Sequence, residues 1–594
     1  MKKLLILSMV FAMAASAGAG TIYVDADATD GANDGTSWAD AYLYLQDGLV
    51  AAQTGDQIWV VEGVYTPDSN SVNPEGTGDR EATFRLKNSV GLYGGYAGYG
   101  QLDPDERDVE TYDTILSGDL EGNDGPDFAN YDENSYSVVI GSGTDPNTVL
   151  DGFTITAGNA DGGGYYELNN GGGMYVWNGI PTVNHCTFNS NHASMIGGGM
   201  YIYNDNFRPL TLTNCTFSNN SANTFGGGLS LMNTDGTLAN CIFNENYCEY
   251  AGGGMSLMGC NLTVRNCLFV DNTQYSVIMT PPDYFGGGGL YNGESSPHLT
   301  NCTFSGNNSI QSFCDGGGAI LNYDNSHPIL TNCILWGDRA NSLPNEISDN
   351  TGCSTTVSYS DVEGGWTGTG NIDEDPCFVL GLVGDYYLSQ IDAGQNSNSP
   401  CMDTGSDTAA NLGMDEYTTR TDIVTDSGIV DMGYHYPPIR NPECMARTNP
   451  DFELWLTAGA PDCWCYCEQC NGDSNGGTQF SGSVTVYTDD LDIFLPAFGN
   501  PDVATTPGHP GWCADLDHKA QFGGLVRVYT NDLDRLLPQF GSTQTPRCSG
   551  PGCFGSHLDI FPGTGCDTNP LPNSEFNFWV IAPFEGATWC WDLK

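Results

Sequence analysis

Basic residues are scarce in this chain of 594 residues: 17 Lys and Arg stand against 73 Asp and Glu, and the formal net charge is −56. Between Arg107 and Arg339, Arg208 and Arg265 are the only Lys or Arg residues. Proteins bind nucleic-acid backbones through clustered Lys and Arg, so the composition argues against nucleic acid as a partner.

Long apolar runs are absent after the N-terminus, and no stretch there approaches the roughly 18 residues that a membrane-spanning helix needs. We therefore predict no transmembrane segment. Residues 1–20 differ, because Lys2 and Lys3 precede an apolar run and then several small residues, a pattern typical of a secretory signal peptide. From this pattern we expect an exported protein that is extracellular or held at the cell surface.

Recognisable catalytic motifs are also missing, since the chain has no nucleophile elbow, metal-binding His pair or phosphate-binding loop. A polysaccharide lyase needs acids that hold calcium and a basic residue on the same face. Arg265 is the only strand-borne candidate for that base, and we interpret it as a solvated side chain. A glycoside hydrolase needs paired carboxylates, and no spacing singles out a pair among the loop acids Asp205, Asp235, Asp283, Asp315 and Asp324. We therefore predict no catalytic residue.

Two short signatures alternate between about residues 170 and 335. One is a glycine triplet, with copies that begin at Gly171, Gly197, Gly226, Gly252, Gly286 and Gly316. The other is Asn-Cys-x-Phe-x-x-Asn, which starts at Asn214, Asn240, Asn266 and Asn301, with weaker copies around Cys186 and Cys333. Self-similarity at a period of 26 to 34 residues indicates a solenoid.

Each period contains short β-type runs punctuated by Gly, Asn and Asp, and none has an apolar pattern long enough for a helix. A unit this short cannot bury its own core, so we predict an all-β fold in which the units stack as coils of a right-handed parallel β-helix. Asparagine ladders are expected at the turns, and the glycine triplets at a corner that needs positive φ or close backbone approach. Stacking predicts two inner columns: Phe188, Phe217, Phe243, Phe269 and Phe304, and Leu212, Leu238, Val264, Leu299 and Leu330.

The cysteines fall into two groups. Twelve lie from Cys186 to Cys401, half of them at one repeat position, and we interpret that column as free thiols packed like small apolar residues. Ten lie from Cys444 to Cys590, where the exported context favours disulfides over a zinc site. The disulfide candidates are Cys463, Cys465, Cys467, Cys470, Cys513, Cys548, Cys553, Cys566 and Cys590.

The Gly-Gly-Gly-Met-Tyr and Phe-x-x-Asn motifs resemble the repeats of the polymorphic outer-membrane protein family. More broadly, residues 21–437 resemble the extracellular, pectate-lyase-like β-helix proteins of planctomycetes, on segments such as Thr21–Asp25, Gly55–Val60 and Leu150–Ile155. The resemblance implies an N-terminal cap and first coils over 21–160, repeat coils over 161–340, and C-terminal coils with a cap over 341–437.

An open solenoid needs a cover at each end. We expect Ala39–Ala52 to form a short amphipathic helix that lies over the first coil, and Asp385–Tyr436 to close the other end. Residues 438–465 are interpreted as a linker, 466–541 as a duplicated module, and 542–594 as a tail rich in cysteine and aromatic residues.

The duplication places Val486–Asp492 and Val528–Asp534 at a separation of 42 residues, each after a cysteine and a run of acids. It resembles the paired calcium loop and helix of dockerin-type modules, with extra residues before each helix. The resemblance implies a partly helical region that binds calcium and a cohesin-like protein partner. The implied ligands are Asp473, Asn475, Asp489, Asp490, Asp515, Asp517, Asn531 and Asp532. The alternative is a metal-free helical hairpin capped by Thr488 and Thr530.

Together, these observations predict a secreted or cell-surface β-helix protein with a structural, adhesive or glycan-binding role. Its expected partner is a polysaccharide or a cell-surface glycan, and calcium is the one cofactor expected. The alternative is an extracellular carbohydrate-active enzyme, either a polysaccharide lyase or a glycoside hydrolase, that acts on an anionic polysaccharide.

Overall fold

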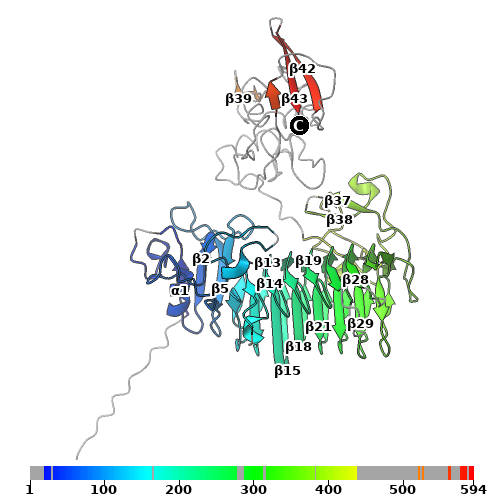
Figure 1. Cartoon of the computed structure of the whole chain (residues 1–594). Coiled ribbons are helices and arrows are strands. Elements are labelled where there is room, and N and C mark those ends of the chain that lie inside the picture. The colour runs from blue at the N-terminus through cyan, green and yellow to red at the C-terminus, as the bar shows by residue number, and fades with distance from the viewer. Residues whose placement is uncertain are drawn as a thin grey trace, which may run out of the picture. The chain divides into compact units, whose positions relative to one another are not determined.

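The computed structural model describes residues 19–437, with the exception of 29–30, 127, 164–165, 277–285, 312–315 and 382. The chain divides into two compact units, Met1–Pro438 and Ile439–Lys594. In the second unit only strand backbone is described: β39 (Ala520–Gln521), β40 (Leu525–Val526), β41 (Ile560–Pro562), β42 (Phe576–Phe584) and β43 (Ala587–Leu593). In the first unit the chain winds through stacked coils (Figure 1).

The coils build three sheets in which nearly all neighbouring strands are parallel. The first sheet holds two adjacent strand columns, and β15 (Met200–Thr213) and β18 (Leu229–Ala239) are long enough to belong to both. The other strands of one column are β4 (Phe84–Arg85), β7 (Val139–Ile140), β11 (Met174–Trp177), β21 (Met255–Met258), β25 (Leu290–Gly293), β29 (Ile320–Tyr323) and β34 (Ile347–Asp349). Those of its neighbour are β1 (Thr21–Val24), β2 (Gln57–Val61), β5 (Gly91–Tyr96), β8 (Val149–Asp151), β12 (Thr182–Asn184), β22 (Leu262–Arg265), β26 (His298–Thr300), β30 (Ile329–Thr331) and β35 (Thr356–Ser358).

The second and third sheets complete each coil. The second contains β3 (Gly63–Tyr65), β6 (Thr114–Ser117), β9 (Thr154–Thr156), β13 (Thr187–Asn189), β16 (Thr216–Ser218), β19 (Ile242–Asn244), β23 (Leu268–Val270), β27 (Thr303–Ser305), β31 (Ile334–Trp336) and β36 (Asp361–Val362). The third contains β10 (Asn159–Ala160), β14 (His192–Ala193), β17 (Ser221–Ala222), β20 (Tyr247–Cys248), β24 (Thr273–Ser276), β28 (Asn308–Gln311), β32 (Arg339–Ala340) and β33 (Leu343–Pro344). This arrangement confirms the predicted parallel β-helix.

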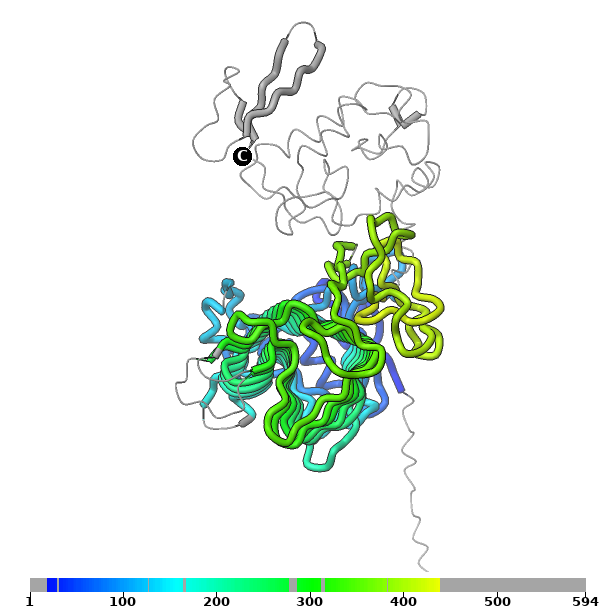
Figure 2. The backbone as a smooth tube through the Cα atoms, turned by 90° about the vertical axis from the view of Figure 1, so that its right-hand side faces the viewer, coloured from blue at the N-terminus to red at the C-terminus, as the bar shows by residue number. Residues whose placement is uncertain are grey.

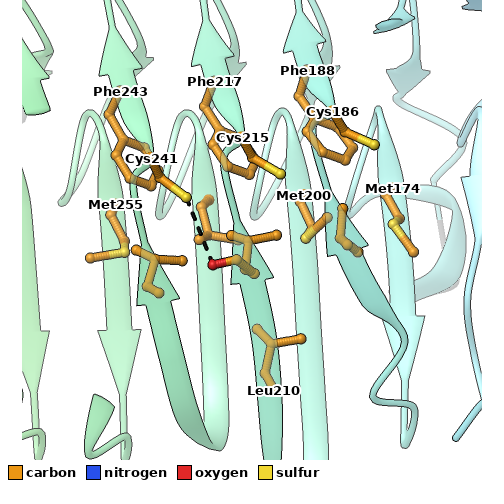
Figure 3. Close-up of a cluster of buried hydrophobic side chains, with 14 of the residues drawn as sticks. Met174, Cys186, Phe188, Met200, Leu210, Cys215, Phe217, Cys241, Phe243 and Met255 are labelled. Atoms are coloured by element: carbon orange, nitrogen blue, oxygen red, sulfur yellow. Dashed lines mark hydrogen bonds between the residues drawn. The ribbon is translucent and has the colours of Figure 1, made fainter. Parts of the chain in front are cut away.

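Both predicted inner columns are present. Phe188, Phe217 and Phe243 stack face to face in successive coils, with ring centroids 4.9 and 5.0 Å apart and planes within 5° of parallel (Figure 3). The column continues through Phe269 to Phe304. Strand spacing within a sheet is ~4.8 Å, so each ring lies at van der Waals distance from the equivalent ring in the next coil. The leucine and valine column is likewise in register and wholly buried.

The asparagine of the repeated Phe-x-x-Asn motif lies inside the turn and forms a ladder of hydrogen bonds from coil to coil. Asn220 Oδ1 accepts hydrogen bonds from the backbone N and from Nδ2 of Asn191, both at 3.0 Å, while Asn220 Nδ2 donates to Phe188 O at 2.8 Å. The same bonds repeat at Asn246, Asn272 and Asn307. This buried amide ladder satisfies backbone groups that the turn removes from the sheets.

The glycine triplets form a corner for two different reasons. Gly197, the first of its triplet, has φ of 68°, which side chains rarely adopt. Gly198, the second, lies against the neighbouring coil, where an added Cβ would stand 2.3 Å from Ser221 O. The corner therefore needs glycine for conformation at one position and for space at the next.

The cysteine column consists of free, buried thiols, as interpreted from the repeat. Each Sγ lies near the carbonyl two residues earlier, as in Cys215 to Thr213 O at 3.1 Å. These thiols line the core beside the phenylalanines (Figure 3) and add apolar volume.

A helix covers the N-terminal end, although it begins later than expected. The 3₁₀ turn η1 (Trp38–Asp40) precedes α1 (Leu45–Ala51), whose Leu45 and Leu49 are buried in the core. The other short helical turns are η2 (Tyr131–Glu133), η3 (Tyr166–Leu168), η4 (Ile391–Ala393) and α2 (Ala409–Leu412).

The expectation that Asp385–Tyr436 closes the C-terminal end is wrong. Trp366 packs against the core there, in a segment whose Ile372 bonds back to Val362. Residues 385–436, which begin in the second strand of the hairpin of β37 (Phe378–Gly381) and β38 (Gly384–Leu388), instead return along the flank of the coils (Figure 2). We call residues 385–436 the flank segment.

The flank segment is held by amides that the turns present outwards. Asn266 exchanges two hydrogen bonds with the backbone of His435, at 2.7 and 2.9 Å, and Asn240 Nδ2 donates to Tyr417 Oη at 2.9 Å. Tyr434 and its neighbours also bury the outward side chains of Leu268 and Val270. The flank segment therefore removes the apolar outer face of β23 from solvent.

Candidate functional site

The outward side chains of β1, β2 and β5 form an aromatic row. Tyr23, Trp59 and Tyr93 occupy equivalent positions in three adjacent strands. Tyr96 stacks on Trp59 with ring centroids 4.7 Å apart and planes 12° from parallel. Trp59 and Tyr93 remain partly exposed. Partly exposed aromatic faces of this kind offer apolar contact surface with a polar edge.

The same row continues into polar residues on the next strands. Asp151, Asn184 and Thr213 follow Tyr93 in register on β8, β12 and β15. Asn184 Nδ2 donates to Asp151 Oδ2 at 2.8 Å, and Thr213 Oγ1 donates to Asn184 Oδ1 at 2.7 Å. The sheet therefore presents one outward row that changes from aromatic to hydrogen-bonding residues.

Arg107 and His185 flank Asp151. Arg107 Nη2 lies 2.6 Å from Asp151 Oδ1, and the guanidinium packs over Tyr93 at 5.6 Å from the ring centroid. His185 Nδ1 lies 3.6 Å from Asp151 Oδ1, and the histidine side chain is 46 % exposed. Burial by itself raises the pKa of Asp151, but hydrogen bonds from His185, Arg107 and Asn184 outweigh it and hold the value at about 2. The carboxylate is therefore charged and fixed in position.

This outer surface is bounded on both sides. Arg107 belongs to the loop between β5 and β6, and its Nε donates to Gly94 O at 2.8 Å. On the other side lies the flank segment, whose Tyr417 accepts a hydrogen bond from Asn240. Between them His185 and Asn214 are exposed. We call the surface formed by Trp59, Tyr93, Arg107, Asp151, Asn184, His185 and Asn214 the open face.

The open face offers exposed hydrogen-bonding groups, one guanidinium, one imidazole and aromatic rings. Such a mixture recognises hydroxyl and carboxylate groups while rings pack on apolar edges. It contains a single carboxylate, so it lacks the acid pair of a glycoside hydrolase. A pocket of about 240 Å³ elsewhere, lined by residues that include Tyr44, Tyr65 and Thr66, has no charged side chain in its lining.

The interpretation of Arg265 as a solvated side chain is wrong. Its Nη1 donates to Leu412 O at 3.3 Å, so the guanidinium anchors the flank segment. Asp205 Oδ2 accepts from Asn178 Nδ2 at 2.6 Å, and Asp235 Oδ1 accepts from Asn261 N at 3.0 Å. Asp324 lies in a turn with φ of 52°. Arg265, Asp205 and Asp235 therefore hold local structure through hydrogen bonds, and neither they nor Asp324 lie in the open face.

The loop acids Asp283 and Asp315 and all predicted site residues fall outside the described residues. These predicted residues are the calcium candidates Asp473, Asn475, Asp489, Asp490, Asp515, Asp517, Asn531 and Asp532, and the disulfide candidates Cys463, Cys465, Cys467, Cys470, Cys513, Cys548, Cys553, Cys566 and Cys590. The calcium and disulfide predictions for the C-terminal module therefore stay predictions.

Two acidic groups were missed by the sequence reasoning. Asp119, Asp124 and Glu133 bring carboxylate oxygens within 4.8 Å of one another. Asp338 and Glu346 form a buried pair at the C-terminal end of the inner amide ladder. The sequence did indicate the unusual position of Asp338, because the last repeat reads Leu-x-x-Asp where the others read Phe-x-x-Asn.

Comparison with known proteins agrees with the coil topology. Residues 129–284 match the family described as "Right handed beta helix region". The fold is a right-handed parallel β-helix. No curated protein matches the chain. Within the described residues, no helix is long and apolar enough to cross a membrane.

Three solved structures show a distant likeness to this β-helix. Pectate lyase Pel9A is 14 % identical, with 70 % of this chain and 96 % of that chain covered and a TM-score of 0.37. A rhamnogalacturonan lyase is 13 % identical, with 64 % and 95 % covered and a TM-score of 0.30. The pectin methylesterase from Aspergillus niger is 12 % identical, with 53 % and 86 % covered and a TM-score of 0.20.

Proposed function

We propose that this protein is an extracellular β-helix that binds a polysaccharide or cell-surface glycan on its open face, in a structural or adhesive role. The observation that carries the proposal is the outward row in which Trp59 and Tyr93 lead directly into Asp151 and Asn184. Successive coils repeat at about the strand spacing of ~4.8 Å, so the row offers regularly spaced contacts to an extended chain.

The rigidity of the open face supports this role. Asp151 is fixed by Arg107 and Asn184, and Arg107 is in turn held by Gly94 O. A binding surface whose side chains are already ordered loses little conformational entropy when a ligand binds. The proposed signal peptide would deliver this surface outside the cell, and the dockerin-like module, with its proposed calcium, would attach it to a cohesin-like partner.

The test is binding of the full-length protein to neutral and anionic polysaccharides, measured by affinity electrophoresis. His185→Asn is the key variant, because asparagine occupies the equivalent turn position at Asn214 and accepts the positive φ of 44° found at His185. We expect it to fold and to bind at least about tenfold more weakly. His327→Asn, an exposed histidine away from the open face, is the matched control and should bind normally. Equal binding by both variants and the parent would refute the proposal.

A carbohydrate-active enzyme is the second candidate, favoured by the exposed imidazole of His185 beside the Arg107 guanidinium. A lyase uses a base and a positive group that neutralises a uronate. The measurement is the appearance of 4,5-unsaturated products or new reducing ends from anionic polysaccharides. Products that disappear in His185→Asn and persist in His327→Asn would replace the binding proposal with catalysis at the same face.

A further inference from the structure

The loop between β6 and β7 gathers three carboxylates that no other part of the proposed function uses. Asp119, Asp124 and Glu133 each place an oxygen within 4.8 Å of the other two. None of them forms an ion pair with a cationic side chain in the described part of the chain. Three carboxylates this close to one another repel when no cation lies between them.

A neighbouring neutral side chain also lacks a partner. Asn134 is fully buried, and its Nδ2 donates to Asp124 Oδ2 at 2.8 Å, so its amide is turned toward the cluster. Its Oδ1 is buried and has no hydrogen-bond donor among the described residues. The same holds for Asp124 Oδ1 and Glu133 Oε1. A buried acceptor without a partner destabilises the fold, so three together favour a cation at this position.

The loop backbone holds this arrangement independently of any ion. Asp119 Oδ1 accepts from Gly122 N at 2.6 Å, and its Oδ2 accepts from Asp124 N at 3.1 Å. Asn134 Nδ2 also donates to Ala157 O at 2.8 Å, which ties the loop to the adjacent coil. These hydrogen bonds hold the Asp119 and Asn134 side chains in place without a bound ion.

We propose that Asp119, Asp124, Glu133 and Asn134 bind a hard divalent cation of the calcium class. Every unpartnered atom here is oxygen, whereas zinc sites favour nitrogen and sulfur ligands. The three carboxylates are partly exposed, which leaves room for water to complete the six to eight ligands that calcium takes. Magnesium demands a tighter octahedral arrangement and loses its water reluctantly, so calcium fits better.

The test is isothermal titration of calcium into the full-length protein and two variants. Asp124→Asn removes a central ligand charge, whereas Asp132→Asn changes an exposed acid in the same loop and serves as the matched control. Any calcium bound by the C-terminal module is common to all three proteins and cancels in the comparison. We expect one binding event that is at least tenfold weaker in Asp124→Asn and unchanged in Asp132→Asn.

Two further measurements distinguish the loss of a calcium ligand from misfolding of the variant. Calcium should slow proteolytic cleavage within residues 119–134 of the parent protein, and circular dichroism should show that Asp124→Asn retains its strands. Glu133→Gln is the alternative variant if Asp124→Asn does not fold. An identical calcium isotherm in the parent and a folded ligand variant, or cleavage unaffected by calcium, would overturn the proposal.

Discussion

Replacing Asp338 with asparagine is expected to stabilise the protein at neutral pH. Asp338 occupies the last rung of the inner amide ladder, where its Oδ1 accepts two hydrogen bonds from Asn307, both at 2.7 Å. Its Oδ2 stands where the other rungs carry an Nδ2 that donates to a carbonyl one coil earlier. Its buried neighbour is Glu346, and the hydrogen bond between the two carboxyls, through a proton held on Glu346, lowers the pKa of Asp338 and raises that of Glu346. The substitution Asp338→Asn removes the buried charge and supplies the Nδ2 donor that the other rungs have.

The structure bounds the size of the effect. Burial raises the pKa of Asp338 from its ordinary 3.8 to about 7, and burial together with the Asp338 charge raises that of Glu346 to about 12. Each tenfold change in an acid constant equals ~1.4 kcal/mol, so the raised pKa of Asp338 sets an upper limit of about 4 kcal/mol on its destabilising effect at high pH. The hydrogen bond with Glu346 offsets part of this cost, and we expect Asp338→Asn to gain about 1–3 kcal/mol at pH 8.

The pH dependence gives the sign of the effect. A raised carboxyl pKa means that the folded protein binds the proton more tightly than the unfolded chain does. Its stabilising contribution is therefore complete below pH ~4 and is lost as the pH rises through about 7. The gain from Asp338→Asn should consequently be small at pH 4 and largest above pH 7.

Thermal unfolding followed by circular dichroism between pH 4 and pH 8 measures this gain. Asp324→Asn, the same substitution at an exposed turn, is the control and should shift the midpoint little at any pH. A midpoint that falls in Asp338→Asn at pH 8, or a gain that does not depend on pH, would refute the reasoning about the ladder.

Three further predictions concern the core, and thermal unfolding is the measurement for the first two. Phe243→Ala should destabilise the protein by about 3–5 kcal/mol because it empties the centre of the ring column. Phe243→Leu should lose less stability, since Leu335 already ends the same column. Equal losses of stability in the two variants would contradict a contribution from ring stacking. Asn246→Ala should cost about 2–4 kcal/mol by stranding buried donors of the ladder, whereas the exposed control Asn206→Ala should cost little. The thiol of Cys186, whose pKa burial raises to about 12, should resist alkylation at pH 8 until denaturant is added, as peptide mass mapping would show; labelling in the folded protein would argue against a packed column.

The repeat coils could be predicted because each coil carries similar residues at equivalent positions, and these positions define the register between neighbouring coils. Residues equivalent to Phe217 and Asn220 recur in successive coils although the loops between them vary in length, and matching these positions gives the strand pairing. The helix start at Leu45 was less predictable, because Tyr42 matches the helical spacing but lies before the helix.

The open face could not be predicted by spacing. Arg107 and Asp151 are 44 residues apart and belong to a loop and a strand with no shared motif. Their contact depends on where the β5–β6 loop returns, which no periodic signal specifies. The acids at Asp119, Asp124 and Glu133 lie close in sequence, but three carboxylates in a loop become informative only when their oxygens are seen to converge.

The path of the flank segment explains why one part of the β-helix surface is exposed and another is covered. In the second sheet the outward residues are polar on β16, where Thr216 and Ser218 lie, and apolar on β23, where Leu268 and Val270 lie. The apolar strand is the one that the flank segment covers. A solvent-exposed β23 would present an apolar patch at risk of association, whereas β16 needs no cover. The change from polar to apolar outward residues between these coils therefore marks, in the sequence itself, where the flank segment covers the second sheet.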